Sequence, residues 1–146
     1  MSTAVALTPE NVRHELAGLP RLARLGLRVA LQLRIGSLLI ETPEGRRFVV
    51  TGVEPGPNAE VKIHTWSFIK RLLNGADVGV AESYMANEWS SPDVTTFLEL
   101  FCRNRDATFD MLRGSPVFRM MTRLRHWLNR NTRKGSRRNI SAHYDL

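Results

Sequence analysis

The spacing of apolar residues changes twice along this chain, from helical to strand-like and back to helical. Residues 8–35 and 66–130 place apolar side chains three and four positions apart, whereas residues 37–64 contain short strand-like runs. Helices on both sides of a block of strands predict an α+β fold. We expect a small antiparallel sheet covered by helices, with basic amphipathic helices at both ends.

Three short strands are predicted in the middle of the chain, at residues 37–41, 46–51 and 60–64. The first two are separated by Pro43-Glu44-Gly45, a turn signature. A Gly/Pro-rich link at 52–58 leads to the third, in which Val61 and Ile63 share a face. Three antiparallel strands are the economical interpretation.

The helices are predicted at residues 8–18, 21–35, 66–74, 80–86, 91–105 and 116–130. A polar residue followed by proline opens three of them, at Thr8-Pro9, Ser91-Pro92 and Ser115-Pro116. Gly75 is suited to the position just after a helix C-terminus. The helix at 21–35 has a basic face and an apolar face, so it either packs on its own domain or lies in a membrane interface.

Charge is distributed unevenly over the 146 residues, which carry a net charge of +7. Residues 1–34 have a net charge of +3, residues 35–110 of −4 and residues 111–146 of +8. Basic segments on either side of an acidic centre predict an anionic partner, either a membrane surface or a nucleic acid.

Several classes of protein are disfavoured by the composition. The single cysteine, Cys102, excludes an internal disulfide and a cysteine-based zinc site, and we expect its thiol to be buried. Neither a secretory signal nor an apolar run long enough to span a bilayer is present. The four histidines lack metal-site spacing, and a Gly-rich cofactor loop after a strand is absent.

Four segments carry a resemblance to a known family: P-E-G-R at 43–46 with the strand after it, which matches loosely, W-S-F-I-K-R-L-L-N-G at 66–75, G-V-A-E-S-Y-M-A-N-E-W at 79–89 and R-R-N-I-S-A-H-Y-D-L at 137–146. They are similar to segments of bacterial cyclopropane-fatty-acyl-phospholipid synthases. The resemblance implies transfer of a methyl group from S-adenosylmethionine to an unsaturated phospholipid acyl chain, with bicarbonate as base. In that family H-Y-D-L opens the methyltransferase domain. We therefore expect this chain to hold the N-terminal domain and linker, with no catalytic residue and no bound cofactor.

This interpretation divides the chain into a basic helical segment at 1–35, an α+β lipid-engaging domain at 36–114, a basic helix at 115–130 and a linker at 131–146. A methyltransferase domain, in cis or in trans, is the implied partner, and a homodimer is a further expectation. Tyr144, in H-Y-D-L, is expected near the cofactor in the whole enzyme. Asn87 stands where the family has glycine, which predicts a positive φ.

An aromatic and aliphatic cluster is open to two interpretations. The cluster comprises Phe68, Leu72, Tyr84, Met85, Trp89 and Phe101. Its side chains either pack the strands against the helices or line a groove for an acyl chain. The order of elements is also similar to the sterol-carrier-protein fold, in which lipid lies between sheet and helices. That similarity is an analogy of fold alone.

Membrane docking is the expected use of the basic residues. The candidates for binding an anionic phospholipid surface are Arg21, Arg24, Arg28, Arg119, Arg123, Arg130, Arg133, Lys134, Arg137 and Arg138. The expected location is cytoplasmic, peripheral on the inner face of the cell membrane. A nucleic-acid-binding module is the alternative, and it is disfavoured because no aromatic residue interleaves with the basic face of residues 116–130.

Overall fold

The computed structural model describes residues 3–113, 120, 123–124 and 126–127. The chain divides into two compact units, residues 1–112 and 113–146. The first unit is α+β, and its elements are β1 (Val5–Ala6), α1 (Val12–Glu15), α2 (Arg21–Ala30), β2 (Ile35–Glu41), β3 (Arg47–Thr51), β4 (Glu54–Ile63), α3 (Ser67–Met85), β5 (Trp89–Ser90), α4 (Val94–Arg103) and α5 (Arg105–Arg113). In the second unit, the described residues are helical.

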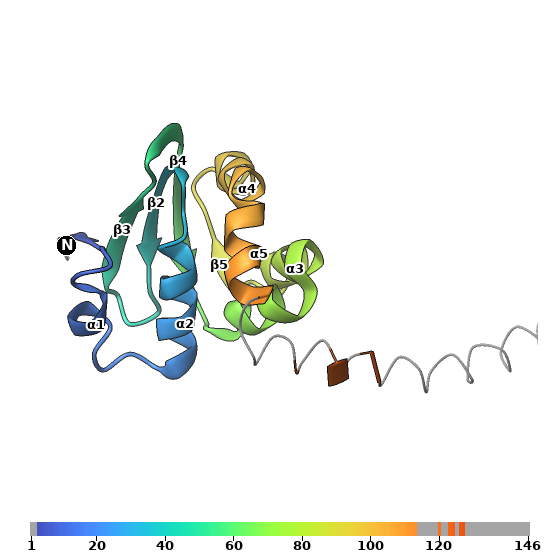
Figure 1. Cartoon of the computed structure of the whole chain (residues 1–146). Coiled ribbons are helices and arrows are strands. Elements are labelled where there is room, and N and C mark those ends of the chain that lie inside the picture. Colours follow the sequence, from blue (N-terminus) through green and yellow to red (C-terminus); the bar gives the residue numbers. More distant parts are fainter. Residues whose placement is uncertain (1–2, 114–119, 121–122, 125, 128–146) are drawn as a thin grey trace, which may run out of the picture. The chain divides into compact units, whose positions relative to one another are not determined.

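The sheet has five strands in the order β1-β3-β2-β4-β5, and it is mixed. β2 is antiparallel to β3 but parallel to β4, and β1 is parallel to β3. The prediction of an antiparallel sheet is therefore wrong. The reason lies in residues 52–53, which lead the chain past the start of β2, so that β3 and β4 flank β2 on opposite sides (Figure 1).

This crossing requires very close approach of backbones at the start of β2. The Gly52 N–H donates to the Gly36 carbonyl at 2.8 Å. Gly36 has a φ of 79°, and a Cβ there would collide with the carbonyl oxygen of Pro57. Only glycine meets both demands.

Residues 54–58, predicted as part of a link, belong to strand β4. Pro55 and Pro57 are tolerated because β5 pairs only with Lys62 and Ile63 at the other end of β4. Both prolines also fall in the register shift between the pairs Ile35–Glu54 and Ser37–Asn58, so a missing N–H removes no paired hydrogen bond from the sheet. Pro and Gly predict a loop from local sequence, which does not report that these residues lie in a bulge of β4 beyond its pairing with β5.

One face of the sheet is apolar and the other is charged. Ile40 pairs with Phe48 on one side and Val61 on the other, and all three side chains are buried. On the opposite face Lys62 forms an ion pair with Glu41 at 2.8 Å. The hydrogen bond from Lys62 lowers the pKa of Glu41. The helices therefore cover the apolar face (Figure 1).

Helix α2 packs on its own domain, which decides between the two interpretations of residues 21–35. Ala23, Leu27 and Val29 are buried, whereas the three candidate arginines of this helix, Arg21, Arg24 and Arg28, are exposed. The apolar face is therefore not available to a membrane. The helix ends at Ala30, five residues before the predicted end, because β2 begins at Ile35.

The predicted helix end at Gly75 is wrong, because residues 67–85 form one helical element, α3. Gly75 does not have the positive φ of a helix-terminating glycine. The element is nevertheless bent. A Cβ on Gly79 would collide with the carbonyl oxygen of Arg71, although residues eight apart in a straight helix are separated by about 12 Å. Gly79 is required where α3 folds against itself.

Helix α4 begins later than predicted. Its N-cap is Asp93, whose carboxylate accepts the Thr96 N–H at 3.0 Å, rather than Ser91. Hydrogen bonds from Thr96 lower the pKa of Asp93. The predicted helix at 91–105 is divided at Asn104, and Cys102, predicted to be buried, is exposed because it lies on the outer face of α4.

The predicted positive φ of Asn87 is confirmed, at 56°. We expect Asn87→Gly to leave the melting temperature unchanged or slightly raised, and Asn87→Val to lower it clearly, because a β-branched residue is strained at this φ. Thermal melts followed by circular dichroism measure the difference. Equal melting temperatures for the three proteins would contradict it.

Candidate functional site

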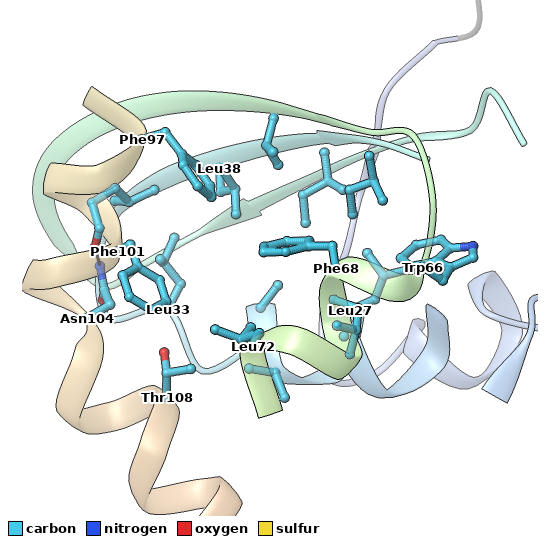
Figure 2. Close-up of a pocket in the computed structure, with 18 residues that line it drawn as sticks. Leu27, Leu33, Leu38, Trp66, Phe68, Leu72, Phe97, Phe101, Asn104 and Thr108 are labelled. Carbon is cyan, nitrogen blue, oxygen red and sulfur yellow. Dashed lines mark hydrogen bonds between the residues drawn. The ribbon is translucent and has the colours of Figure 1, made fainter. Parts of the chain in front are cut away.

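An apolar cavity of about 90 Å³ lies between the sheet and its covering helices. Strands β2 and β4 form one wall, and helices α2, α3, α4 and α5 contribute to the others (Figure 2). The lining is dominated by aliphatic and aromatic side chains, among them Leu27, Ile40, Val61, Phe68, Leu72 and Phe97.

The size and chemistry of this cavity favour an apolar occupant. About 10–15 Å³ of such volume holds one water molecule, so the space takes roughly six to nine groups of that size. Apolar cavities of this kind stay dry and bind apolar molecules, because water there would lack hydrogen-bond partners. A short hydrocarbon segment fits, whereas a complete phospholipid does not.

Three of the six predicted groove residues line the cavity, and three do not. Phe68, Leu72 and Phe101 are on its wall. Trp89 lies deeper, whereas Tyr84 and Met85 are 47% and 78% exposed. The cluster is thus divided between a cavity wall, a core residue and the surface.

Trp89 is the largest fully buried side chain of the first unit. Its indole N–H donates to the Ser83 hydroxyl at 2.9 Å. Its ring centroid lies 4.6 Å from that of Phe97, 4.9 Å from Tyr84 and 5.9 Å from Phe68. Trp89 therefore packs against two residues of the cavity wall, Phe68 and Phe97, without lining the cavity itself.

The segments at 66–75 and 79–89 meet at the bend of α3. Arg71, from the first segment, contacts Glu82, from the second, at 3.7 Å and Glu88 at 2.9 Å. The hydrogen bond from Arg71 to Glu88 raises the pKa of Arg71. The second carboxylate oxygen of Glu88 is buried without a hydrogen-bond partner within the described part of the chain. These contacts give the segments a structural role.

Asn104 is a buried residue of the cavity wall that sequence reasoning missed. Its carbonyl oxygen accepts the backbone N–H groups of Arg34 and Ile35 at 2.8 and 3.0 Å. Its amide donates to the carbonyls of Ile35 and Leu100 at 2.9 and 2.8 Å. Asn104 thereby fastens the end of α4 to the start of β2. The only signal in the sequence was a polar residue after the apolar stripe of 94–101.

At another part of the wall, Trp66 is tied to the β2–β3 turn. Its indole N–H donates to the Glu44 carboxylate at 2.9 Å. Burial raises the pKa of Glu44, but hydrogen bonds, chiefly that from Trp66, outweigh it and bring the pKa below its ordinary value. The carboxylate is thus ionised at neutral pH, and this bond weakens only as the pH falls into the acid range.

The structure describes four of the candidate surface-binding arginines, namely Arg21, Arg24, Arg28 and Arg123, and all four are exposed. Arg119, Arg130, Arg133, Lys134, Arg137, Arg138 and Tyr144 lie outside the described residues. In the described part of the second unit, Met120, Leu124 and Trp127 are exposed apolar side chains on helical residues.

The described residues contain neither a metal-binding cluster nor a membrane-spanning helix. No cluster of three His, Cys, Asp or Glu side chains is placed to hold a metal ion. Among the helices that the structure describes, none is long and apolar enough to cross a bilayer.

Comparison of the chain with family models, curated proteins and solved structures gives no match.

Proposed function

We propose that this chain is the lipid-engaging N-terminal domain of a cyclopropane-fatty-acyl-phospholipid synthase-like methyltransferase, and that its cavity receives part of a phospholipid acyl chain. Catalysis, S-adenosylmethionine and bicarbonate belong in this proposal to a methyltransferase domain acting in cis or in trans. The chain itself binds lipid and does not transfer the methyl group.

The apolar cavity is the observation that carries the proposal. Native cores contain few voids larger than a water molecule, because each unfilled space forfeits packing energy. The cavity of about 90 Å³ is walled by aliphatic and aromatic groups, and hydrocarbon that fills it restores the packing energy lost to the empty space. Its place between sheet and helices supports the analogy with sterol-carrier proteins, which is part of this proposal.

The surface charge supports a membrane as the source of that hydrocarbon. Arg21, Arg24 and Arg28 are exposed, and residues 111–146 carry a net charge of +8. Each such residue near an anionic leaflet contributes about 1 kcal/mol. Docking on the inner face of the cell membrane would bring acyl chains to the domain.

Octanoate, whose chain is short enough for the cavity, tests the proposal. We expect octanoate to bind the whole chain, and Leu72→Trp to abolish binding because the larger ring fills the space. Isothermal titration calorimetry measures both. Leu98→Trp, on the exposed side of α4, is the matched control, since Leu98 is 40% exposed and does not line the cavity. Wild-type affinity in Leu72→Trp would contradict the proposal.

Vesicle flotation tests membrane docking. We expect binding to phosphatidylglycerol vesicles and not to phosphatidylcholine vesicles, with loss at high salt because counter-ions screen the arginines within about 10 Å at 0.1 M. Arg119, Arg123 and Arg130 changed together to Glu should remove most of the binding. Failure to bind either vesicle, with tight salt-dependent binding of duplex DNA, would favour the nucleic-acid alternative.

A further inference from the structure

Only three residues of the cavity wall carry polar side-chain groups, and they differ in what those groups do. They are Trp66, Asn104 and Thr108. The Trp66 N–H is bound to Glu44, and Asn104 makes four hydrogen bonds to backbone groups. Within the described residues, the Thr108 hydroxyl makes no hydrogen bond to the protein. It is therefore the one polar side chain on the wall still able to bind a ligand.

The Thr108 hydroxyl lies at one end of the cavity. Figure 2 shows it pointing from α5 towards Leu33 and Phe101, with Trp66 on the far side of the cavity. Leu33, Phe101 and Thr108 are all half-buried, so this end reaches the surface. The opposite wall is formed by buried apolar residues such as Ile40 and Val61, which lie on the sheet.

Two cationic residues follow wall residues of this end in the chain. Arg34 follows Leu33 in the chain, and its backbone N–H is held by Asn104. Arg105 follows Asn104, and both arginines are exposed. Arg34 forms an ion pair with Glu54 at 4.0 Å, so charges of both signs lie beside this part of the chain, whereas the sheet wall is apolar.

We infer that the cavity binds the acyl chain of a lipid in one direction, with its carbonyl or carboxylate at Thr108 and its hydrocarbon extending over β2 and β4. This inference rests on the proposed function, and it adds the orientation of the ligand and the residue that sets it. The hydroxyl donates to the acyl oxygen, which is a strong hydrogen-bond acceptor when it belongs to a carboxylate. A free fatty acid and a phospholipid share this chemistry.

Removal of the hydroxyl alone tests the inference. Thr108→Val keeps the side-chain size, and we expect it to weaken octanoate binding about tenfold, the loss of one hydrogen bond to a charged group. Thr108→Ser should keep most of the affinity. The control is Thr95→Val, at an exposed position of α4 outside the cavity wall, which should bind as the wild type does. Carbon NMR of carboxyl-labelled octanoate, measured alongside calorimetry, should show a carboxyl shift that Thr108→Val removes.

The outcomes separate this inference from the proposed function. If Leu72→Trp abolishes binding while Thr108→Val retains wild-type affinity and the same carboxyl shift, the orientation is overturned and the proposed function stands. If Leu72→Trp binds octanoate normally, the proposed function is overturned, and the inference with it.

A second ligand distinguishes the two lipid sources. Dioctanoylphosphatidylglycerol, below its micelle concentration, presents an acyl ester in place of a carboxylate. If Thr108→Val weakens both ligands, Thr108 recognises the acyl oxygen of either lipid. If only octanoate binding is weakened, the Thr108 end of the cavity recognises a free fatty acid. If only phospholipid binding is weakened, it recognises an ester lipid. Weakening of neither contradicts the inference.

Discussion

Asn104→Ala should destabilise the first unit by about 3 kcal/mol or more and lower its melting temperature by about 10–20 °C. The substitution removes four side-chain hydrogen bonds, of which three join the end of α4 to Arg34 and Ile35 and the fourth reaches Leu100 within α4. Part-buried backbone groups of Arg34 and Ile35 lose these partners, and a backbone group left unsatisfied in the interior costs about 1–3 kcal/mol. Chemical denaturation followed by circular dichroism measures the loss.

The control for this prediction is Asn58→Ala. Asn58 is an exposed asparagine whose side-chain oxygen accepts one hydrogen bond, from the Ser37 hydroxyl at 2.7 Å. Its removal should cost less than about 1 kcal/mol. Equal losses in the two variants would show that Asn104 does not hold the helix to the strand.

Asn104→Asp adds a test by pH. An aspartate has the same shape, but the oxygen that replaces the amide nitrogen faces the carbonyls of Ile35 and Leu100. Only the protonated acid can donate there, so its pKa in the folded protein should be raised above the ordinary value of about 3.9. Stability should then be greatest below about pH 4 and fall as the pH rises through the raised pKa. Melting temperatures from pH 3.5 to 8, compared with those of the wild type, measure this change.

The sequence predicted most of the elements but not how the strands pair. Alternation places Val61 and Ile63 on one face whatever their neighbours are, so the strands and their buried faces were predictable. The parallel pairing of β2 with β4 depends on Gly36 and Gly52, which allow a two-residue crossing. Nothing local distinguishes such glycines from those of an ordinary turn.

The bend of α3 illustrates a second limit. Gly75 satisfied the local rule for a helix end, yet the chain remains helical there and folds back so that Gly79 packs on Arg71. Tertiary contacts, including the ion pairs of Arg71 with Glu82 and Glu88, hold this bend. Local propensity cannot report contacts formed between the two ends of one element.

The candidate site was predictable only in part, for a physical reason. Helical spacing identifies which side chains point inward, and it therefore found Phe68, Leu72 and Phe101. It cannot tell an inward side chain that borders a void from one that is packed on all sides, as Trp89 is. Asn104 and Thr108 were missed because single polar residues on a helix usually face solvent.

Trp89→Ala should destabilise the first unit by about 3–5 kcal/mol, the loss typical of a buried tryptophan. Trp89 is 1% exposed and contacts the rings of Phe68, Tyr84 and Phe97, so truncation leaves a void that these rings cannot fill without moving. The expected fall in melting temperature is about 15 °C or more. Differential scanning calorimetry measures it.

The matched control is Trp127→Ala, because Trp127 is 60% exposed and should be replaced at little cost to stability.

Trp89→Phe separates packing from hydrogen bonding. It keeps an aromatic ring but removes the N–H that donates to Ser83, so the loss of stability should be smaller than in the alanine variant. Since Phe68 and Phe97 are also cavity-wall residues, Trp89→Phe should loosen the wall and change octanoate affinity as well as stability. A melting temperature for Trp89→Ala equal to that of Trp127→Ala would show that Trp89 is not a core residue. Its support of the cavity would then have to be abandoned.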